Sequence, residues 1–375
     1  MTLAITLFVI CAVLILLVQH TAQRRQYIDR ISGSKYRYSA VLVFVMFLVV
    51  AFISAHRFGF CDTGLYREIC AGMGTSYNRL NDENLAFDDY GFNFLMVFLN
   101  RCGFAPQSII IFCSYVTFAV FFYILYKHSS DLPFSLFLLM FLSYYTLING
   151  IRQVLAAAIL LMGLPFLRDR RFWYYLLFVL LAYTIHASAI VMLPLYFVLT
   201  RKRLNVGIWA FFGVVALFFV APGLANALLG SVLEDSTYSE YLDIDQQMGI
   251  TRLLVAAVPL ILTGFYCKVT AYDPKPSPDS QEYLSYKLTN LLINMQFVSF
   301  GFTILGLRMV YFARISMYFE ITNALLLPIV ITKGFNRDSA RTIKHIAITL
   351  YFLYFLYQTY TYSTYGYFND FRLVF

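Results

Sequence analysis

The chain has 375 residues, of which 60% are hydrophobic and only 13% are charged. A soluble domain of this length could not bury so much apolar surface, so the composition excludes a soluble globular protein. The formal net charge of +8 would suit a nucleic-acid-binding protein, but the basic residues are concentrated in short segments between apolar runs, which argues against that class.

The N-terminal stretch MTLAITLFVICAVLILLVQH is apolar and has no basic residue in front of it. The first positive charges, Arg24 and Arg25, follow the apolar run. A cleaved signal peptide has the opposite order, with its basic residues first. We therefore expect a first membrane helix that is retained.

The apolar residues fall into runs of about the length that crosses a bilayer as a helix. They predict an all-α polytopic membrane protein in which a single membrane domain, residues 1–375, contains about twelve transmembrane helices. The predicted spans are 2–19, 38–55, 107–126, 132–148, 150–167, 172–185, 187–200, 205–223, 251–267, 286–305, 315–332 and 345–362. The apolar stretch 91–104 is too short to span, so we expect it to lie at the interface or to dip in and return.

The orientation follows from the excess of basic residues in cytoplasmic loops. With the N-terminus outside, the cytoplasmic segments hold 19 of the 28 Lys and Arg residues, including all eight lysines. An even number of spans then places the C-terminus outside as well. The nine basic residues on the outer side are all arginines: Arg57, Arg67, Arg79, Arg101, Arg152, Arg252, Arg308, Arg314 and Arg372.

Two outer segments are long and polar, residues 56–106 and residues 224–250, whereas most cytoplasmic loops are short and basic. This pattern indicates that function lies at the outer face. Arginine keeps its charge at a membrane boundary and offers a planar donor fork to phosphate or carboxylate. An outer arginine could instead anchor lipid headgroups or pair with a carboxylate, and we favour these roles for Arg79, Arg101 and Arg372.

The first outer segment begins with HRFGFCDTGLYRE, which contains His56, Arg57, Asp62, Tyr66 and Arg67. It lies directly after the second predicted span. Its carboxylate and its arginines are therefore expected at the depth of the lipid headgroups.

A second group is NGIRQ, which runs from Asn149 to Gln153 and places Arg152 in the first turn of a predicted span. The free N–H groups and the dipole of a helix N-terminus already favour an anion at that place. An arginine added there repels the helix terminus unless something negative is bound. A phosphate and a protein carboxylate are both candidates.

Two further groups lie on the outer side. His186, in TIHAS, stands at a turn between spans, where it could act as an acid, a base or a structural hydrogen-bond donor. The segment GLRMVYFARISMYFE contains Arg308, Arg314 and Tyr318. Glu320 lies deeper in the same predicted span, and we expect a salt bridge to an arginine there.

Metal chemistry has weak support in the sequence. There is no HExxH and no Cys/His cluster with zinc spacing. Asp88–Asp89 and Asp243-x-Asp245 are acidic pairs that could hold a divalent ion, but such pairs are common in solvated loops. Of the six cysteines, Cys61 and Cys70 share the first outer loop and could pair in an oxidising compartment.

The order of these groups carries a resemblance. Arg57-x4-Asp62-x3-Tyr66 is followed by DDYGFN, by the N-x-I-R-Q of Asn149–Gln153, by a His-x-Ser turn at His186, and by R-x3-Y-F before a Leu-Leu-Leu-Pro span. From about residue 38 to residue 335, the chain resembles the EpsG/Wzy-type family of bacterial polysaccharide polymerases. It departs from the family's more usual R-x-x-x-G-x-D pattern, because Phe60 stands where glycine is expected.

The resemblance implies a GT-C-like membrane glycosyltransferase bundle in the bacterial cytoplasmic (inner) membrane. The implied reaction transfers a growing glycan from undecaprenyl pyrophosphate to the non-reducing end of a lipid-linked repeat unit at the outer face. No metal, nucleotide sugar or other cofactor is expected. The implied partners are the lipid-linked oligosaccharide and the bilayer, with a chain-length regulator and a flippase in addition, and no nucleic acid.

The residues fit this chemistry, because a pyrophosphate leaving group needs cations at headgroup depth and an acceptor hydroxyl benefits from a base. We choose Asp62 as the base, with His186 as its rival. The substrate-binding candidates are Arg57, Tyr66, Arg152, Gln153, Arg308, Arg314 and Tyr318.

Three alternatives remain. The first, a purely structural membrane protein, would not need so many outer arginines. A lipid-sugar-dependent glycosyltransferase or an O-antigen ligase has the same leaving group and a different acceptor. A lipid-linked oligosaccharide flippase should carry charges along a central cavity, whereas here only Glu320 lies well inside a span.

Overall fold

The computed structural model describes residues 2–82, 85, 89–221, 223, 249–271, 275–280 and 282–374. These residues are mainly helical, so the prediction of a helical membrane protein is confirmed. The only sheet among the described residues is a two-stranded antiparallel pair, β1 (Gln23–Arg24) with β2 (Tyr36–Arg37).

Five helical stretches are long and apolar enough to cross a membrane. They are α1 (Thr2–His20), α5 (Ser108–His128), α15 (Ile250–Val269), α16 (Tyr283–Leu305), and the run Tyr311–Gly334, which comprises most of α17 (Val310–Ile315), then η4 (Ser316–Phe319) and α18 (Glu320–Gly334).

Six shorter apolar stretches accompany them. They are α2 (Ala40–Ala55), the run of α6 (Leu132–Leu138), η2 (Leu139–Ser143) and α7 (Tyr144–Ile148), then α8 (Ile151–Met162), α10 (Phe172–Ile185), the pair η3 (Ala187–Val191) and α11 (Met192–Leu199), and α12 (Val206–Val220).

These eleven stretches coincide with the first eleven predicted spans. The predicted span 345–362 lies within the longer and more polar helix α19 (Arg337–Thr364). The predicted span 150–167 is divided, because α8 ends before Gly163 and α9 (Leu164–Arg168) begins there with Pro165 near its start. The number of crossings and their orientation remain predictions.

Polar cap residues begin several of these helices, because a side-chain oxygen can accept one of the N–H groups that the first turn leaves unbonded. Ser39 accepts from the N–H of Leu42, Asn205 from Gly207, and Asn336 from Ser339. These caps fix where helices α2, α12 and α19 start, and so which residues belong to each helix.

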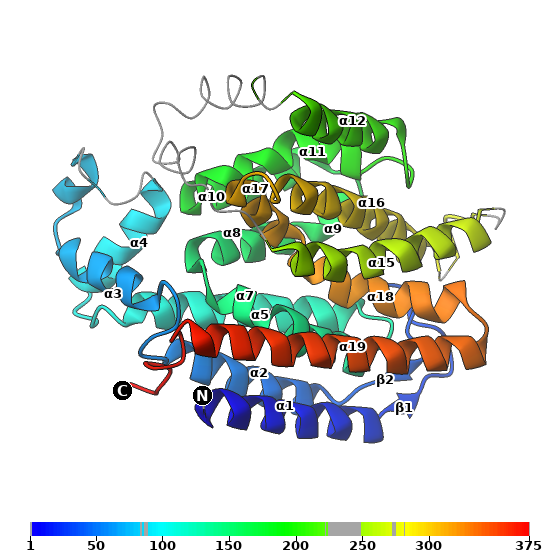
Figure 1. The fold of residues 1–375 in the computed structure, drawn as a ribbon, viewed down its shortest axis with the longest axis horizontal. Coiled ribbons are helices and arrows are strands. Elements are labelled where there is room, and N and C mark those ends of the chain that lie inside the picture. Colours follow the sequence, from blue (N-terminus) through cyan, green and yellow to red (C-terminus); the bar gives the residue numbers. More distant parts are fainter. Residues whose placement is uncertain are drawn as a thin grey trace.

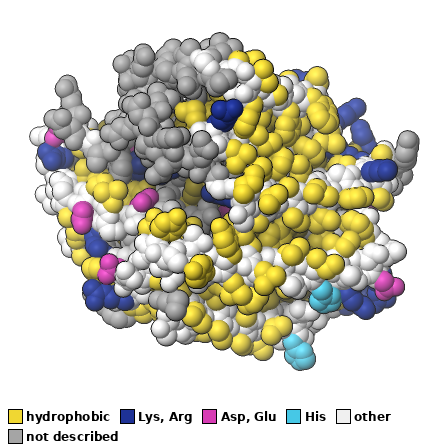
Figure 2. All heavy atoms as spheres, viewed as in Figure 1, with side chains coloured by type: hydrophobic (Ala, Val, Ile, Leu, Met, Phe, Trp, Pro, Cys, Tyr) yellow, Lys and Arg dark blue, Asp and Glu magenta, His cyan; other side chains and the backbone are white. Residues whose placement is uncertain are grey.

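The main helices lie side by side in a bundle, with α3 and α4 at one end together with both chain termini (Figure 1). Hydrophobic side chains cover a broad central zone of the surface, and Lys and Arg side chains are found mainly toward the two ends (Figure 2). Val41 on α2, Leu177 on α10 and Leu254 on α15 are among the apolar residues that these helices expose. A band of this kind suits contact with lipid.

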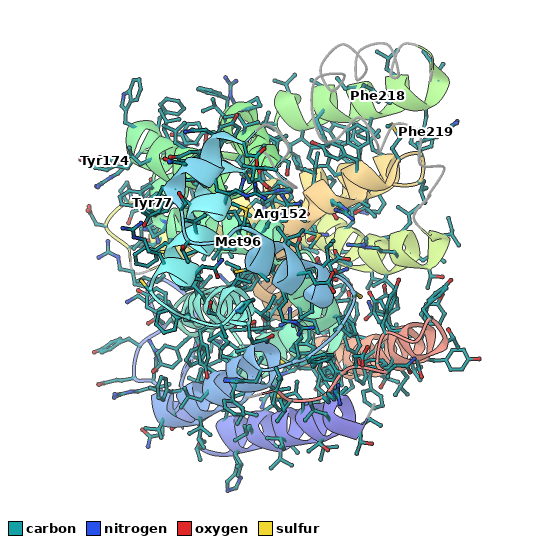
Figure 3. All side chains as sticks on the ribbon, turned by 90° about the vertical axis from the view of Figure 1, so that its left-hand side faces the viewer. Tyr77, Met96, Arg152, Tyr174, Phe218 and Phe219 are labelled. Atoms are coloured by element: carbon teal, nitrogen blue, oxygen red, sulfur yellow. The ribbon has the colours of Figure 1, made fainter. Side chains whose placement is uncertain are left out.

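The end that carries both termini is built from the first polar segment, 56–106. It contains α3 (Thr63–Gly72), η1 (Tyr77–Asn81) and α4 (Tyr90–Arg101), and Figure 3 shows this end facing the viewer with Arg152 near its middle. The C-terminal residues pair with the start of the segment, since Phe58 donates to the carbonyl of Arg372 at 2.7 Å and Val374 to that of His56 at 2.7 Å.

Helix α4 is amphipathic. Phe92, Met96 and Val97 are buried on one side, and Tyr90, Phe94 and Phe98 are exposed on the other. The second long polar segment, 224–250, lies outside the described residues apart from its last two positions.

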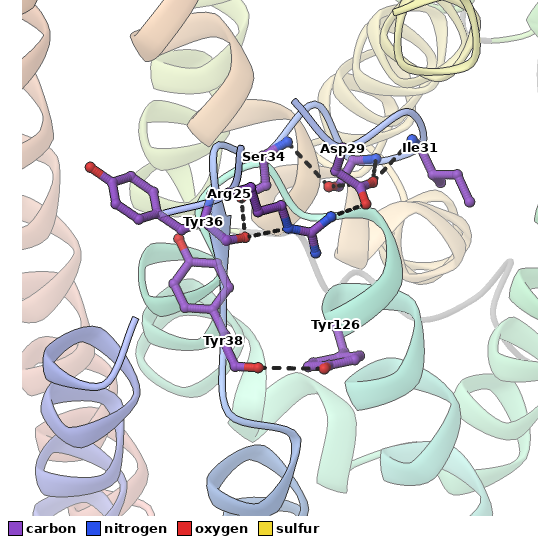
Figure 4. A network of polar contacts seen from close by, with 8 residues as sticks. Arg25, Asp29, Ile31, Ser34, Tyr36, Tyr38 and Tyr126 are labelled. Carbon is purple, nitrogen blue, oxygen red and sulfur yellow. Dashed lines mark hydrogen bonds and ion pairs between the residues drawn. The ribbon is translucent and has the colours of Figure 1, made fainter. Parts of the chain in front are cut away.

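The opposite end of the bundle contains an ordered loop between α1 and α2. Arg25 forms an ion pair with Asp29 and donates from Nε to the carbonyl of Tyr36 at 3.0 Å (Figure 4). The carboxylate of Asp29 also accepts from the N–H of Ile31 at 3.0 Å, and Tyr126 of α5 donates to the carbonyl of Tyr38 at 3.4 Å. These bonds fix the loop against the bundle.

Candidate active site

Helix α8 begins at a sharp change in chain direction. Gly150 has a φ of 57°, in the left-handed region, and its N–H donates to the side chain of Asn149 at 2.9 Å. Glycine suits this position because a Cβ disfavours that conformation. The turn starts α8 directly after α7 and places Arg152 in the first helical turn, as the sequence predicts.

The guanidinium of Arg152 forms an ion pair with the carboxylate of Asp89. Asp89 directly precedes α4, and its side chain is only 3% exposed, against 16% for Arg152. Arg152 also lies over the ring of Tyr66, with 5.9 Å between Cζ and the ring centre. Of the two candidates for the anion at this helix terminus, the structure therefore shows a protein carboxylate in place.

The carboxylate of Asp89 also contacts two further groups. Its Oδ2 lies 3.3 Å from Nδ1 of His186, and its Oδ1 accepts from the N–H of Ala187 at 2.9 Å. The close approach of α4 to α10 permits this, because a Cβ on Gly91 would lie 2.5 Å from Oγ1 of Thr184. Asp89, Arg152 and His186 thus form one buried cluster, which we call the outer cluster.

The charges in the outer cluster fix its protonation. Burial raises the pKa of Asp89, but the hydrogen bond from His186, the charge of Arg152 and the N–H of Ala187 together bring the pKa below its usual value. Burial lowers the pKa of His186, as do the charges of Arg152 and Arg314, and these outweigh the opposite pull of Asp89. At neutral pH Asp89 is therefore ionised and His186 is neutral.

A neutral His186 carries one ring proton. Placing it on Nδ1 lets that atom donate to Asp89, and this leaves Nε2 with its lone pair. The arrangement is that of a base whose tautomer is fixed by a carboxylate.

Tyr66 joins the first outer loop to the outer cluster. Its side chain is buried on α3, and burial raises the pKa of its hydroxyl against the pull of Arg152 and Arg314. The charge of Asp62 acts on the same hydroxyl. Asp62 itself is partly exposed just before α3 and makes no side-chain cap to that helix.

Two other predicted residues join neighbouring elements to the cluster. Gln153 donates from Nε2 to the carbonyl of Arg314 at 2.7 Å, which connects α8 to α17. The hydroxyl of Tyr318 lies 2.8 Å from that of Ser188, two residues after His186. The side chain of Arg314 is exposed.

Arg57 lies in the protein interior. Its guanidinium is fully buried and donates to Oγ1 of Thr63 at 3.0 Å, to Oγ of Ser114 at 3.2 Å, to the carbonyl of Ile148 at 2.8 Å and to that of Ser54. Burial lowers the pKa of Arg57 to about 10, so it remains charged at neutral pH. The structure thus assigns it protein partners from α2, α3, α5 and α7, and not a place in the outer cluster.

The remaining outer arginines also have protein neighbours. Arg308 is exposed and lies over the ring of Phe219, with 5.2 Å between Cζ and the ring centre, so it does not join the outer cluster. Arg79 forms an ion pair with Asp82 at 2.6 Å, as predicted. Arg372 lies 4.6 Å from the ring centre of Phe58.

Asp89 was not among the predicted site residues, and its sequence suggested only half of an acidic pair of a kind that is common in solvated loops. Its signal was its place in DDYGFN directly before the amphipathic stretch that becomes α4. Its neighbour Asp88 and the second pair, Asp243 and Asp245, lie outside the described residues.

Two smaller predictions also have structural outcomes. Cys61 and Cys70 are free, and the thiol of Cys70 donates to Oδ1 of Asn100 at 3.5 Å, so they do not form the disulfide that their positions allowed. Within the described ranges, Glu320 forms no ion pair within 4.0 Å. It hydrogen-bonds with Ser143, and Arg252 acts on it from farther away.

Comparison with known proteins identifies the family. The model of the EpsG family matches residues 40–371, which include every residue of the outer cluster. Searches of curated proteins and of solved structures return no match. Since the match covers most of the chain, the protein belongs to the EpsG family of polysaccharide polymerase-like membrane proteins.

Proposed function

We propose that the protein is a polysaccharide polymerase of the bacterial cytoplasmic membrane. It transfers a growing glycan from undecaprenyl pyrophosphate to the non-reducing end of a lipid-linked repeat unit at the outer face. The observation that supports this most directly is the outer cluster, which combines a cation at a helix N-terminus with a carboxylate-held histidine.

The leaving group of this reaction is a pyrophosphate that gains negative charge as the glycosidic bond breaks. Arg152 is suited to stabilise that charge, because it stands in the first turn of α8 and its guanidinium has five N–H donors. One such side chain can hold Asp89 and a phosphate oxygen together. Arg314, whose charge acts on both Tyr66 and His186, is the second cation that we assign to the pyrophosphate.

Asp89 then has a positioning role. It fixes the direction of the Arg152 guanidinium and holds His186 through Nδ1. A buried carboxylate between the cation and the base keeps both in place before the substrate arrives. This lowers the cost of reorganisation in the transition state.

We assign the role of general base to His186 and rank Asp62 second. The sequence alone favoured Asp62 over His186. In the proposed step, Nε2 of His186 accepts the proton of the acceptor sugar hydroxyl as its oxygen bonds to the anomeric carbon of the donor glycan. The bond from that carbon to the pyrophosphate oxygen breaks, and its electron pair leaves with undecaprenyl pyrophosphate. The proton on His186 then passes to solvent.

The exposed face of helix α4 is a second observation in favour of a lipid-linked substrate. Its exposed residues Tyr90, Phe94 and Phe98 form an aromatic face directly after Asp89. Aromatic side chains favour the membrane–water boundary, and they also stack on sugar rings. An undecaprenyl chain and its sugar would meet this face before the pyrophosphate reaches Arg152. A chain-length regulator and a flippase would complete the pathway as partners.

The test is a gel of surface glycan from cells that carry the wild type, a deletion, Arg152→Ala or Arg152→Lys at matched protein levels. We expect single repeat units, and no ladder, from the deletion and from Arg152→Ala. A ladder from Arg152→Ala would remove Arg152 from the proposed site. Loss of all surface glycan in the deletion, with lipid-linked units trapped on the inner face, would replace the polymerase by a flippase.

A further inference from the structure

A cavity lies at the end of the bundle opposite the outer cluster. Its volume is about 950 Å³, and it is open on one side and bordered by the end of α9, the end of α11 and the loop after it, the end of α15, the start of α16 and the end of α18. By the distribution of basic residues this end is the cytoplasmic one. We call this space the basic cavity.

The lining of the basic cavity is strongly cationic. Eight basic side chains line it: Arg168, Arg170, Arg201, Lys202, Arg203, Lys275, Lys287 and Lys333. Among the described lining residues Glu282 is the single carboxylate. Figure 2 shows Lys and Arg side chains gathered toward this end of the molecule, at its right-hand edge.

Three of these cations have protein partners. Lys287 pairs with Asp169 at 2.6 Å and Arg168 with the same carboxylate at 2.8 Å. Arg203 donates to Oγ1 and to the carbonyl of Thr270, each at 2.7 Å. The other five, Arg170, Arg201, Lys202, Lys275 and Lys333, form no ion pair within 4.0 Å with any residue that the structure describes.

Membrane topology alone does not require this convergence. The rule that cytoplasmic loops are basic is satisfied by charges anywhere in those loops. Arg24, Arg337 and Arg341 satisfy it as exposed residues that do not line the cavity. Cations from five chain segments around one space repel each other, and that repulsion is relieved by an anion of matching size.

The lining also has an apolar part. Leu167, Leu199, Leu291 and Tyr266 contribute to the wall. Leu167, Leu199 and Tyr266 stand at or near helix ends, and Leu291 lies about two turns inside α16. A phosphate-bearing molecule with an apolar portion therefore fits both kinds of lining.

We propose that the basic cavity binds the phosphate group of an anionic ligand on the face opposite the outer cluster. Its source is either the headgroup of an anionic phospholipid or a soluble phosphoanion. We choose Arg170, Arg201 and Lys202 for the test, since all three line the cavity and are exposed.

Two binding measurements on the full-length protein separate the two sources. The first purifies it from nanodiscs of phosphatidylcholine with phosphatidylglycerol and counts retained phosphatidylglycerol by native mass spectrometry. The second titrates inorganic pyrophosphate into protein in phosphatidylcholine nanodiscs, with Arg152→Gln present throughout so that the outer cluster does not contribute.

The test variant is Arg170→Gln/Arg201→Gln/Lys202→Gln, and the control is Arg24→Gln/Arg337→Gln/Arg341→Gln, which removes three exposed cations from the same end without touching the cavity. We expect the test variant to bind the relevant ligand at least about tenfold more weakly, while the control binds as the wild type does. Arg170→Lys/Arg201→Lys retains the charge and is expected to retain binding.

Retention of phosphatidylglycerol that only the test variant loses supports the proposal with a lipid headgroup as ligand. Pyrophosphate binding that only the test variant loses supports it with a soluble anion. Equal binding by the test and control variants in both measurements overturns it and leaves the cations a topological role. Should the test variant misfold, wild-type binding that does not weaken with rising salt also contradicts the proposal.

Discussion

The carboxylate of Asp89 pairs with the guanidinium of Arg152, although the two residues are 63 positions apart in the chain. The same carboxylate contacts His186, which is 97 positions from Asp89 in the chain. Three segments with no sequence proximity therefore share one buried charge. The pair gives Arg152 the negative partner that a cation at a helix N-terminus needs.

The first prediction concerns the coupling of this pair. Asp89→Ala leaves Arg152 without its carboxylate and is expected to destabilise the protein by about 1–3 kcal/mol, less than for a fully buried pair because Arg152 is partly exposed. The double variant Asp89→Ala/Arg152→Ala should lose less stability than the sum of the losses in the two single variants. Thermal unfolding in detergent measures this, and additive losses would show that the pair is not coupled.

A second prediction concerns the base. His186→Ala is expected to lower the polymerisation rate about 10²–10⁴-fold, because Nε2 no longer accepts the proton of the acceptor hydroxyl. His186→Asn can still donate to Asp89 but cannot act as a base, so it should retain stability and remain slow. A rate for His186→Asn close to that of the wild type would transfer the role to another residue.

The pH dependence follows from the same residue. The base works only when unprotonated, so the rate falls as the pH drops through the pKa of His186. Since burial and the neighbouring arginines lower that pKa, the acidic limb should lie below the ordinary histidine value of about 6.5. The profile of the purified enzyme checks this, with Asp62→Asn as the comparison. If Asp62→Asn removes the acidic limb and His186→Asn does not, Asp62 is the base.

A third prediction separates two arginines that the sequence treats alike. Arg57→Ala leaves the buried acceptors of Ser54 and Ile148 without their donor, so we expect a loss of about 2–4 kcal/mol in the free energy of unfolding. Arg308→Ala removes an exposed side chain and should change it by less than about 0.5 kcal/mol. Unfolding curves that rank the two variants equally would contradict the buried role of Arg57.

The contrast between these residues shows what the sequence can predict. The position of Arg152 at the head of α8 was predictable, because an apolar run and its boundary are local features. Its partner was not, because Asp89 reaches it only after α4 has packed on α10, and sequence spacing does not report that contact. Arg57 could not be distinguished from the exposed arginines for the same reason, since its burial depends on α5 and α7.

Local features explain where the apolar helices form, but not every break within them. Eleven apolar runs become helices where predicted, since length and composition determine them. The break at Gly163 follows from packing as well as from Pro165, because a Cβ on Gly163 would lie 2.9 Å from Cδ2 of Tyr175. That contact joins α8 to α10, and no single run of sequence contains both.

The last prediction tests whether the packing of α4 sets the position of Asp89. In Gly91→Ala the added Cβ would lie 2.8 Å from Cβ of Thr184 and 2.9 Å from its carbonyl oxygen, and the backbone atom cannot rotate away. Helix α4 must therefore move from α10, and Asp89, two residues earlier, moves with it. We expect a loss of about 1–3 kcal/mol in stability and a shortened glycan ladder, although Gly91 itself touches no substrate. Gly64→Ala in α3 is the matched control, because no atom lies within 4 Å of the added Cβ. A wild-type ladder from Gly91→Ala would mean that α4 can shift without disturbing Asp89, and the site would then not depend on this contact.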